Sequence, residues 1–485
     1  MLAPWAIEEM KPADLGDKRL NRRLAQILSH FAERPTASIP AACGGHAEMT
    51  AAYRFFDNDK VTCAKTLQPH IDKTLERVAA QPIALLVQDT TEIDLSRPEL
   101  DVDGAGPLAD ASRRGVFLHP LHAFTPDGTP LGTAWAKTWA RDDEPDLTKA
   151  EKRKRRKAAP IEAKESVRWL EGLRQARHVA EVAQETTCVC ISDSESDIYE
   201  LFIEPREGVA GRPVEWLIRA CQDRGLIASE AAPEIARLRE AALAAPVLFT
   251  REISVRGRTP KTACEDRARR QPRCDRKAFM SARATVATLR PPARPGQKLP
   301  PVTVNVVLVR EDAPPEGEEP IEWLLVTTLS IETIEDVSTI ISYYTVRWLI
   351  ELLFRILKSG CRVERRRFEH VDRLLPCAAV YLIVAWRTLL VCRMGRSCPD
   401  ISCEAIFEPA EWQSVYVTVL KKPVPAEPPS LETMVRLIAQ LGGYVNRAKR
   451  KDPPGVQTIW LGMQRMQDLA LAWVSFGPGA RAELV

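Results

Sequence analysis

The chain has 485 residues, of which 45% are hydrophobic and 27% charged, a composition typical of a globular protein with about two to four domains. Its formal net charge is only +3, so the overall charge does not by itself indicate a nucleic-acid-binding protein. No uninterrupted apolar run is long enough to span a membrane, and the first residues lack the features of a signal peptide, so we expect no membrane segment.

The twelve cysteines contain no C-x-x-C pair and no zinc-type spacing. The closest pair, Cys188 and Cys190, is typical of two small apolar residues in a strand. We therefore expect reduced cysteines and an intracellular protein.

Four short basic runs stand out in this nearly neutral chain. Each is either a plain solvated charge run or a local patch that contacts a polyanion, and together they favour the patches. They occupy residues 17–23, 152–157, 364–369 and 446–451.

The elements predicted in chain order begin with helices over residues 1–75, including an amphipathic helix that is basic along one side. Residues 82–95 predict an apolar strand that ends at Asp89, and residues 115–139 predict two strands joined by a turn at "TPDG". A charged segment then leads into a helix over residues 165–183.

The second half of the chain begins with a buried strand that ends at Asp193, and residues 214–223 predict another strand. Residues 226–310 combine β-like runs with a Pro- and Arg-rich stretch, and residues 321–329 again predict a strand. From about residue 372 the chain is predicted to be helical to its end, with a Pro-rich link at 422–429.

The segment that starts at Tyr343 predicts one apolar helix with a line of polar residues. Two interpretations are open for this line: ion pairs along a solvated stripe, or a metal-binding glutamate beside basic residues that hold phosphate. At about 100° per residue, four side chains fall within roughly 60° of one another: Tyr344, Arg347, Glu351 and Lys358.

Two predicted strands end in an aspartate, Asp89 and Asp193, at the position where α/β sheets hold ligands. Together with Glu351 they offer the oxygen ligands that Mg²⁺ prefers, and Mn²⁺ is an expected substitute. Two such ions about 4 Å apart can activate an attacking oxygen and stabilise a leaving oxygen at a phosphodiester. The alternatives are a turn residue for Asp89 and a helix N-cap for Asp193.

The segment "YYTVRWLIELLFRILKSG" carries a Y-x2-R-x3-E-x6-K signature and resembles bacterial DDE transposases of the insertion-sequence-four family. "LGDKRLNRRLAQI" and "AAYRFFDND" resemble the DNA-binding region of that family. "VQDTT" and "CISDSESDIYE" resemble the strands with the two catalytic aspartates, and "EWLLVTT" resembles the strand before the catalytic helix. "LIAQLGGYVNRAKRKDPPG" and the tail resemble the dimerisation region, so the resemblance covers nearly the whole chain.

The resemblance implies an α/β fold: a ribonuclease-H-like catalytic core with an inserted β-rich domain, flanked by N- and C-terminal helical regions. It implies a transposon-end DNA-binding domain at 1–75 and a catalytic core at 76–371, with the insertion at about 226–320. The helical dimerisation region would then occupy residues 372–485.

The implied activity is cut-and-paste DNA transposition. Metal-activated water nicks the transposon end, the freed 3′-hydroxyl forms a hairpin, water resolves the hairpin, and the 3′-hydroxyl joins target DNA. Asp89, Asp193 and Glu351 would hold two Mg²⁺ ions. The implied partners are transposon-end DNA, target DNA and a second copy of the chain in a paired-end complex, in the bacterial cytoplasm at the nucleoid.

The resemblance also implies DNA contacts. Tyr344, Arg347 and Lys358 would hold the terminal phosphate and distorted bases. Trp323 would stack on a flipped base, with a core tryptophan as the alternative. Arg219 either faces the active site or forms a structural ion pair. In the N-terminal region the expected DNA contacts are Lys18, Arg19, Arg22, Arg23, Tyr53 and Arg54.

Other positions have specific expectations. Ser194 stands where the family usually has Arg, which puts a phosphate or scaffold contact in question but not the metal ligand. His119 and His122 share a strand pattern but have no third partner, so a core or surface role is expected. Two C-terminal apolar stripes predict a helix-on-helix dimer surface, with Leu461, Met466 and Leu469 as candidates, or a plain extension of the core.

Two other classes compete with an active transposase. One is a catalytically inactive protein that binds transposon ends as an inhibitor or domesticated regulator. The presence of all three acids and the four-residue signature disfavours it. The other is a different ribonuclease-H-like nuclease such as a resolvase, which would need neither the N-terminal basic helices nor the long C-terminal helical region.

Overall fold

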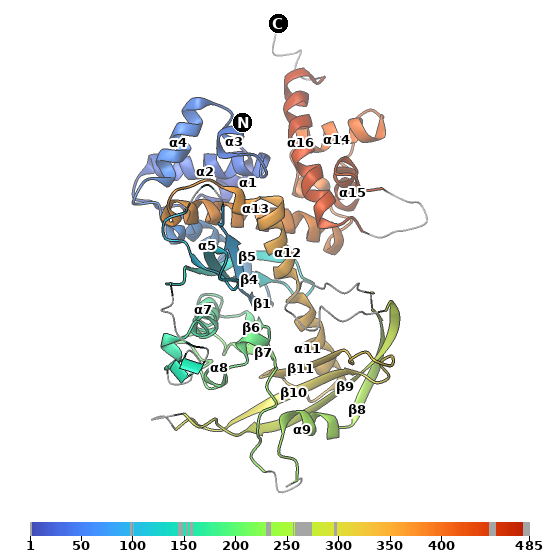
Figure 1. Cartoon of the computed structure of the whole chain (residues 1–485). Coiled ribbons are helices and arrows are strands. Elements are labelled where there is room, and N and C mark those ends of the chain that lie inside the picture. Colours follow the sequence, from blue (N-terminus) through green and yellow to red (C-terminus); the bar gives the residue numbers. More distant parts are fainter. Residues whose placement is uncertain are drawn as a thin grey trace. The chain divides into compact units, whose positions relative to one another are not determined.

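The computed structural model divides the chain into two compact units (Figure 1). Unit 1 comprises Met1–Asp146 and Trp348–Val485, and unit 2 comprises Leu147–Arg347. The structure describes residues 2–97, 99, 101–143, 148, 150–151, 154–155, 159–228, 234–255, 257, 274–294, 298–445 and 453–478. Most of the basic run 152–157 and all of the run 446–451 lie outside these residues.

Unit 1 begins with helices, as the periodicity of residues 1–75 predicts. Helix α2 is capped by Asp17, whose Oδ1 accepts the backbone N–H of Arg19 at 2.8 Å, and it buries Leu24, Ile27 and Phe31. These N-terminal helices are α1 (Pro4–Glu9), α2 (Lys18–Glu33), α3 (Ile39–Cys43), α4 (His46–Phe56) and α5 (Cys63–Ala79).

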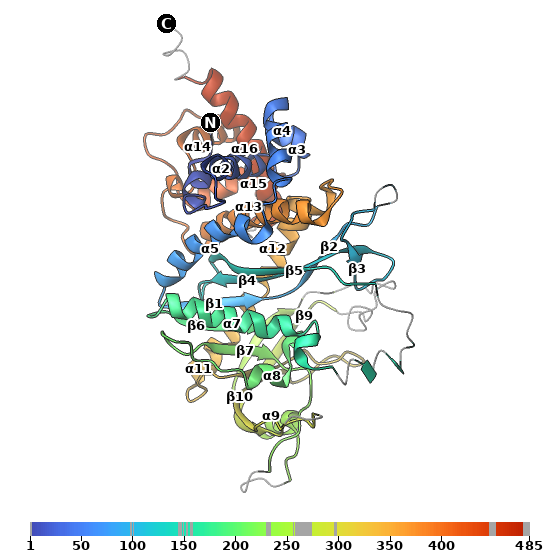
Figure 2. The same ribbon diagram turned by 90° about the vertical axis from the view of Figure 1, so that its left-hand side faces the viewer.

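The sheet of unit 1 is centred on β4, which pairs antiparallel with each of the other four strands. Helix α5 lies along β5 (Figure 2), where Gly132 lets the strand approach Thr74. The predicted strands and the turn at 125–128 are confirmed. The five strands are β1 (Ile83–Gln88), β2 (Thr91–Asp94), β3 (Gly106–Pro107), β4 (Arg114–Phe124) and β5 (Pro130–Trp139).

The C-terminal part of unit 1 is helical, with the predicted Pro-rich interruption between two helices. Helices α14, α15 and α16 pack against one another, and Gly462 allows α16 to approach the backbone of α15 closely. The elements are α12 (Leu349–Arg355), the π-helical turn η3 (Ile356–Gly360), η4 (Val363–Arg365), α13 (Val371–Ser397), η5 (Cys403–Ala405), α14 (Pro409–Leu420), α15 (Leu431–Leu441) and α16 (Val456–Phe476).

Helix α13 corrects the expectation that no segment is long and apolar enough to cross a membrane. The helix passes that test by length and composition, with a mean hydropathy of 1.9 over its most apolar window. However, 83% of this window is buried inside the structure, where α13 packs on α2, α5 and β5. It therefore forms the central core helix of unit 1.

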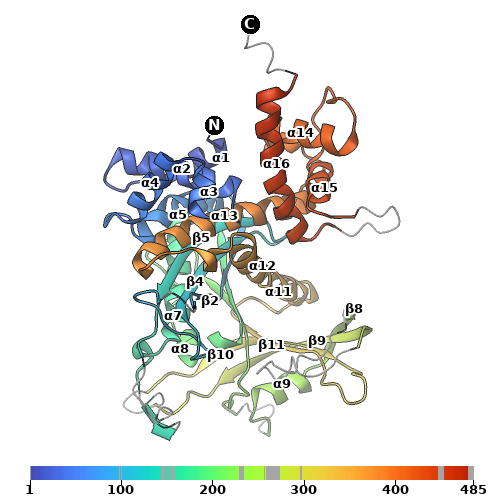
Figure 3. The same ribbon diagram turned by 45° about the horizontal axis from the view of Figure 1, so that its top comes forward.

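Unit 2 contains a sheet with the strand order β6-β7-β11-β10-β9-β8, in which β6 and β7 are parallel and the other pairs are antiparallel. The β-rich residues after β7 therefore extend one sheet. Helices α11 and α9 lie on opposite sides of its outer strands (Figure 3). The elements are η1 (Ile161–Ala163), α7 (Val167–Val182), β6 (Thr187–Ser192), η2 (Ser194–Ser196), α8 (Tyr199–Phe202), β7 (Glu215–Arg219), α9 (Leu238–Ala244), β8 (Val247–Val255), β9 (Arg276–Leu289), β10 (Val302–Glu311), β11 (Glu322–Thr327) and α11 (Ile334–Val346).

The prediction of one continuous helix from Tyr343 to Lys358 is wrong. Helix α11 ends at Val346, α12 begins at Leu349, and the N–H of Arg347 bonds the carbonyl of Tyr344 instead of one four residues back. Further on, the N–H of Cys361 reaches the carbonyl of Ile356, five residues back, at 2.7 Å. The chain therefore passes through a turn and then a π-helical turn, a feature that is frequent at functional sites.

The eleven cysteines that the structure describes are free thiols. Cys188 and Cys190 are buried in β6, as their spacing predicts.

Candidate active site

Asp193 follows directly after β6 in unit 2. Its Oδ1 accepts the N–H of Glu195 at 2.9 Å, so the aspartate caps the short helix η2. Its Oδ2 takes no hydrogen bond from the described part of the chain, and the residue is half-buried. The cap interpretation is thus structurally correct, and it leaves one oxygen available to a ligand.

Asp197 fixes the turn that carries Asp193, a role that the sequence analysis missed. It is 2% exposed, and its Oδ1 lies 2.5 Å from Nη2 of Arg224. Its Oδ2 accepts the N–H groups of Cys221 and Gln222 at 2.8 and 2.7 Å. This buried pair ties the end of β6 to the residues that follow β7. The sequence signal was the second aspartate of "SDSESD", which local pattern alone does not distinguish from the first.

Tyr344 is the centre of a cluster at the end of α11. It is 1% exposed, its ring centroid lies 5.7 Å from that of Trp323 on β11, and the Arg347 guanidinium lies 5.9 Å from the ring. Burial raises the pKa of Tyr344, the positive charges of Arg347 and Arg219 oppose this rise, and the charge of Asp193 adds to it. The structure therefore brings these five predicted residues together within unit 2.

Arg219 and Trp323 lie on neighbouring strands of this cluster. Arg219 is exposed at the end of β7, and its Nη2 donates to the carbonyl of Glu322 at 3.4 Å. Trp323 is half-buried rather than a fully buried core side chain. The exposed guanidinium of Arg219 and the half-buried indole of Trp323 suit phosphate and base contacts, and the buried Tyr344 ring packs against that indole.

Asp89 follows β1 in unit 1, and a buried histidine fixes the residues on either side of it. Its Oδ1 accepts the N–H of Thr90 at 2.7 Å. Nδ1 of His119 lies 2.8 Å from Oγ1 of Thr90, and its Nε2 lies 3.1 Å from Oε1 of Gln88. Of the core or surface roles expected for His119 and His122, the structure shows the core role, since both side chains are fully buried.

Glu351 and Lys358 lie in unit 1, on α12 and η3. Glu351 is exposed, unlike Tyr344 and Arg347, which share its predicted helix face. The cause is the turn after α11, where Tyr344 and Arg347 are buried before the chain reaches α12. Lys358 is half-buried and lies 3.3 Å from Oε1 of Glu364.

The N-terminal candidates are mainly exposed. Arg19 pairs with its own N-cap Asp17 at 2.9 Å, and the Tyr53 ring lies 6.3 Å from that of Phe368. The side chains of α2 and α4 therefore offer cations and an aromatic ring at the surface. The exposed members are Lys18, Arg19, Arg22, Tyr53 and Arg54, and Arg23 is half-buried.

Asp89 and Glu351 belong to unit 1, whereas Asp193 belongs to unit 2. Among the described residues, no group of three or more His, Cys, Asp or Glu side chains is arranged to hold a metal ion.

Three family models match successive parts of the chain. Residues 2–61 match a transposase DNA-binding family, residues 139–375 match a transposase DDE domain, and residues 383–476 match a Tn5 transposase dimerisation domain. The chain belongs to the DDE transposases. The order of the three matches is that of a Tn5-like transposase.

The matched domains indicate DNA as a partner, a homodimer, and the divalent metal ions that DDE domains generally use. Among solved structures, the chain is similar to a piggyBac transposase synaptic complex with hairpin DNA, solved by cryo-EM. The identity is 10%, the TM-score is 0.36, and the match covers 82% of this chain and 73% of that chain.

Proposed function

We propose that the protein is a cut-and-paste DNA transposase of the insertion-sequence-four family with a ribonuclease-H-like core. It would nick transposon ends, form and resolve a hairpin, and join the 3′-hydroxyl ends to target DNA in the bacterial cytoplasm. The observation that carries this proposal is the unit 2 cluster, in which Tyr344 lies in the electrostatic field of Asp193, Arg219 and Arg347 and against Trp323.

We propose Asp89, Asp193 and Glu351 as the metal-binding carboxylates. Their chemistry fits Mg²⁺, because all the donors are oxygens, none is fully buried, and Oδ2 of Asp193 has no hydrogen bond from the described residues. Two bound ions would activate an attacking oxygen and stabilise a leaving one. Asp197 and His119 would keep Asp193 and Asp89 in place through the hydrogen bonds described above.

The cationic and aromatic residues would orient the DNA. Arg347 and Arg219 are planar guanidinium groups that suit a terminal phosphate, and Lys358 adds a point charge. Trp323 offers a half-buried indole face on which an unpaired base can stack, as a hairpin requires. Ser194 supplies no positive charge, so Arg219 would take a larger share of the phosphate contact.

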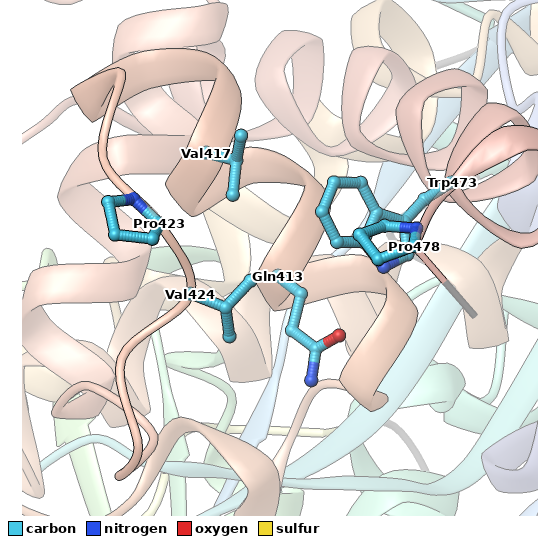
Figure 4. A pocket seen from close by; sticks show the side chains of 6 residues that line it. All are labelled: Gln413, Val417, Pro423, Val424, Trp473 and Pro478. Carbon is cyan, nitrogen blue, oxygen red and sulfur yellow. The ribbon is translucent and has the colours of Figure 1, made fainter.

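We propose that the homodimer forms through the exposed apolar side chains of α16. Leu461 is 37% exposed and Leu471 is 61% exposed. Next to α16 lies an apolar hollow of about 450 Å³, lined by Val417, Val424 and Trp473 among others (Figure 4). An exposed apolar surface of this kind in a matched dimerisation domain supports an isologous contact between two copies.

Replacing Asp193 by Asn tests the metal-ligand role separately from the cap. The Asn oxygen can still accept the N–H of Glu195, but it offers no negative charge to a metal ion. We expect cleavage of DNA carrying the flanking inverted repeats to fall at least about 100-fold, which corresponds to about 2.7 kcal/mol of barrier, with end binding unchanged. Cleavage at the wild-type rate would show that Asp193 is only a cap.

The same assay with the unaltered protein separates the two functional classes. Binding of the inverted repeats with metal-dependent cleavage supports the transposase. Binding without cleavage in Mg²⁺ or Mn²⁺ would favour a catalytically inactive end-binding protein instead.

A further inference from the structure

Lys358, in the π-helical turn η3, is held by one carboxylate of unit 1. Its Nζ lies 3.3 Å from Oε1 of Glu364, and the two side chains are 30% and 29% exposed. The same Oε1 accepts the backbone N–H of Asp94 at 3.1 Å. The end of β2 thus holds the Glu364 side chain through this hydrogen bond, independently of the contact with the lysine.

The backbone that carries Glu364 is also held on both sides. Nη2 of Arg97 donates to the carbonyl of Glu364 at 3.0 Å and to that of Arg366 at 2.5 Å. Arg366 is 4% exposed and donates to the carbonyl groups of Pro35, Ala37 and Cys361, with its guanidinium over the ring of Tyr381. Hydrogen bonds to the N-terminal region and to the residue after η3 therefore hold the short segment 361–366 in place.

A lysine side chain is a flexible phosphate ligand, because its rotatable bonds must be ordered when the phosphate binds and this costs conformational entropy. A fixed carboxylate reduces this cost by holding the ammonium group before DNA arrives. An ammonium group has three N–H donors, and Glu364 occupies one of them, which leaves two for a phosphate oxygen.

We infer that Glu364 is a positioning residue that holds Lys358 in place for the transposon-end phosphate. This inference rests on the proposed function, which assigns that phosphate to Lys358. It predicts that a change at Glu364 affects the cleavage rate and DNA binding differently, which a purely structural residue would not produce. Loss of the Glu364 charge should slow cleavage by enzyme saturated with DNA. It should not weaken DNA binding, because it removes a negative charge that repels the DNA phosphates.

The test uses full-length protein and inverted-repeat DNA in single-turnover cleavage. Glu364→Gln keeps an oxygen for the N–H of Asp94 and loses the charge that holds Lys358. We expect the saturated rate to fall about threefold to fivefold, the range for one partly exposed ion pair, with unchanged or tighter binding. Asp400→Asn, an exposed change elsewhere in unit 1, is the matched control and should cleave at the wild-type rate.

The decisive comparison is made in the Lys358→Ala background. If Glu364 acts through Lys358, the double variant cleaves at the rate of Lys358→Ala alone. Equal proportional losses in both backgrounds, or a wild-type rate for Glu364→Gln with intact Lys358, would overturn the inference. Melting temperatures within the range of the control exclude a folding defect. If Glu364→Gln melts lower, Glu364→Asp is used instead: it keeps the charge but withdraws the carboxylate by one methylene from Lys358, so the same fall in the saturated rate is expected.

Failure of the proposed function gives a different result. If Lys358→Ala cleaves normally, Lys358 does not hold the phosphate, and the proposed positioning role of Glu364 is then also wrong. If the unaltered protein binds ends but does not cleave them, the transposase proposal itself is wrong. In that case a Glu364→Gln variant that binds less tightly would independently refute the positioning role.

Discussion

Glu9, at the end of α1, forms a buried ion-pair network that should contribute strongly to the stability of unit 1. It is 5% exposed and lies 2.5 Å from Nδ1 of His70 and 2.9 Å from both terminal nitrogens of Arg77. Nε2 of His70 accepts the N–H of Thr133 at 3.0 Å, so the ring is neutral and its Nδ1–H donates to Glu9.

The pKa of Glu9 gives the magnitude. Burial alone would raise this pKa, but the hydrogen bonds from His70 and Arg77 and the positive charge of Arg77 outweigh burial and lower it from 4.5 to about 2. This lowering of the pKa corresponds to roughly 3 kcal/mol of folding free energy in favour of the ionised form. Because the folded pKa is depressed, this stabilisation is complete above about pH 4.5 and is lost as the pH falls towards about 2.

Glu9→Gln removes the charge at nearly constant volume. Because a chain of two units need not unfold in one step, hydrogen exchange of peptides from α1 and α5 is the suitable measurement. At pH 7 we expect about 100-fold faster exchange, the equivalent of roughly 3 kcal/mol, and the difference should shrink as the pH falls below about 4.5.

Glu8→Gln is the matched control for Glu9→Gln. Glu8 is the exposed neighbour, and it lies 3.1 Å from Lys73. An exposed pair contributes about 1 kcal/mol at most. An exchange difference for Glu9→Gln that is no larger than that of Glu8→Gln, or that persists unchanged at pH 2, would refute the argument.

Two further predictions concern DNA binding and assembly. Replacing Lys18 or Arg22 by Ala should weaken binding of end DNA and lower the slope of log affinity against log salt by about 1 each, and an unchanged slope would exclude a phosphate contact. Leu461→Asp and Leu471→Asp should leave single-end binding intact and abolish the paired-end complex in gel-shift assays. A paired complex at the normal level would place the dimer contact elsewhere. Met466 is 1% exposed, so Met466→Asp should unfold the C-terminal helices rather than report on the dimer.

The positions of Asp89 and Asp193 could be predicted from the sequence, because short apolar runs followed by an acid define strand ends without distant information. The course of residues 343–360 could not. Nothing in the local pattern breaks the helix there, and the π-helical turn lies where Gly360 packs against Trp460, far along the chain. A local hydrophobic pattern does not contain such a contact.

The basic run 364–369 shows the same limit in another form. As a string of charges it predicts a solvated patch or a polyanion contact, and Arg365 and Arg367 are indeed exposed. Arg366 is instead buried, because the carbonyl groups of Pro35 and Ala37 arrive from the other end of the chain to accept its hydrogen bonds. Glu364 likewise has a distant partner, since its Oε1 accepts the backbone N–H of Asp94.

The contact between Gly360 and Trp460 limits how freely the C-terminal helices can be exchanged between related proteins. A β-carbon at position 360 would lie 3.2 Å from the indole of Trp460, so even alanine there requires the indole to shift. Helix α16 therefore cannot be replaced without regard to the residue at position 360. A chimaera that takes these helices from another transposase also needs a compatible residue at position 360. A chain that ends before α16 lacks the Trp460 indole, which packs against the π-helical turn that contains Lys358.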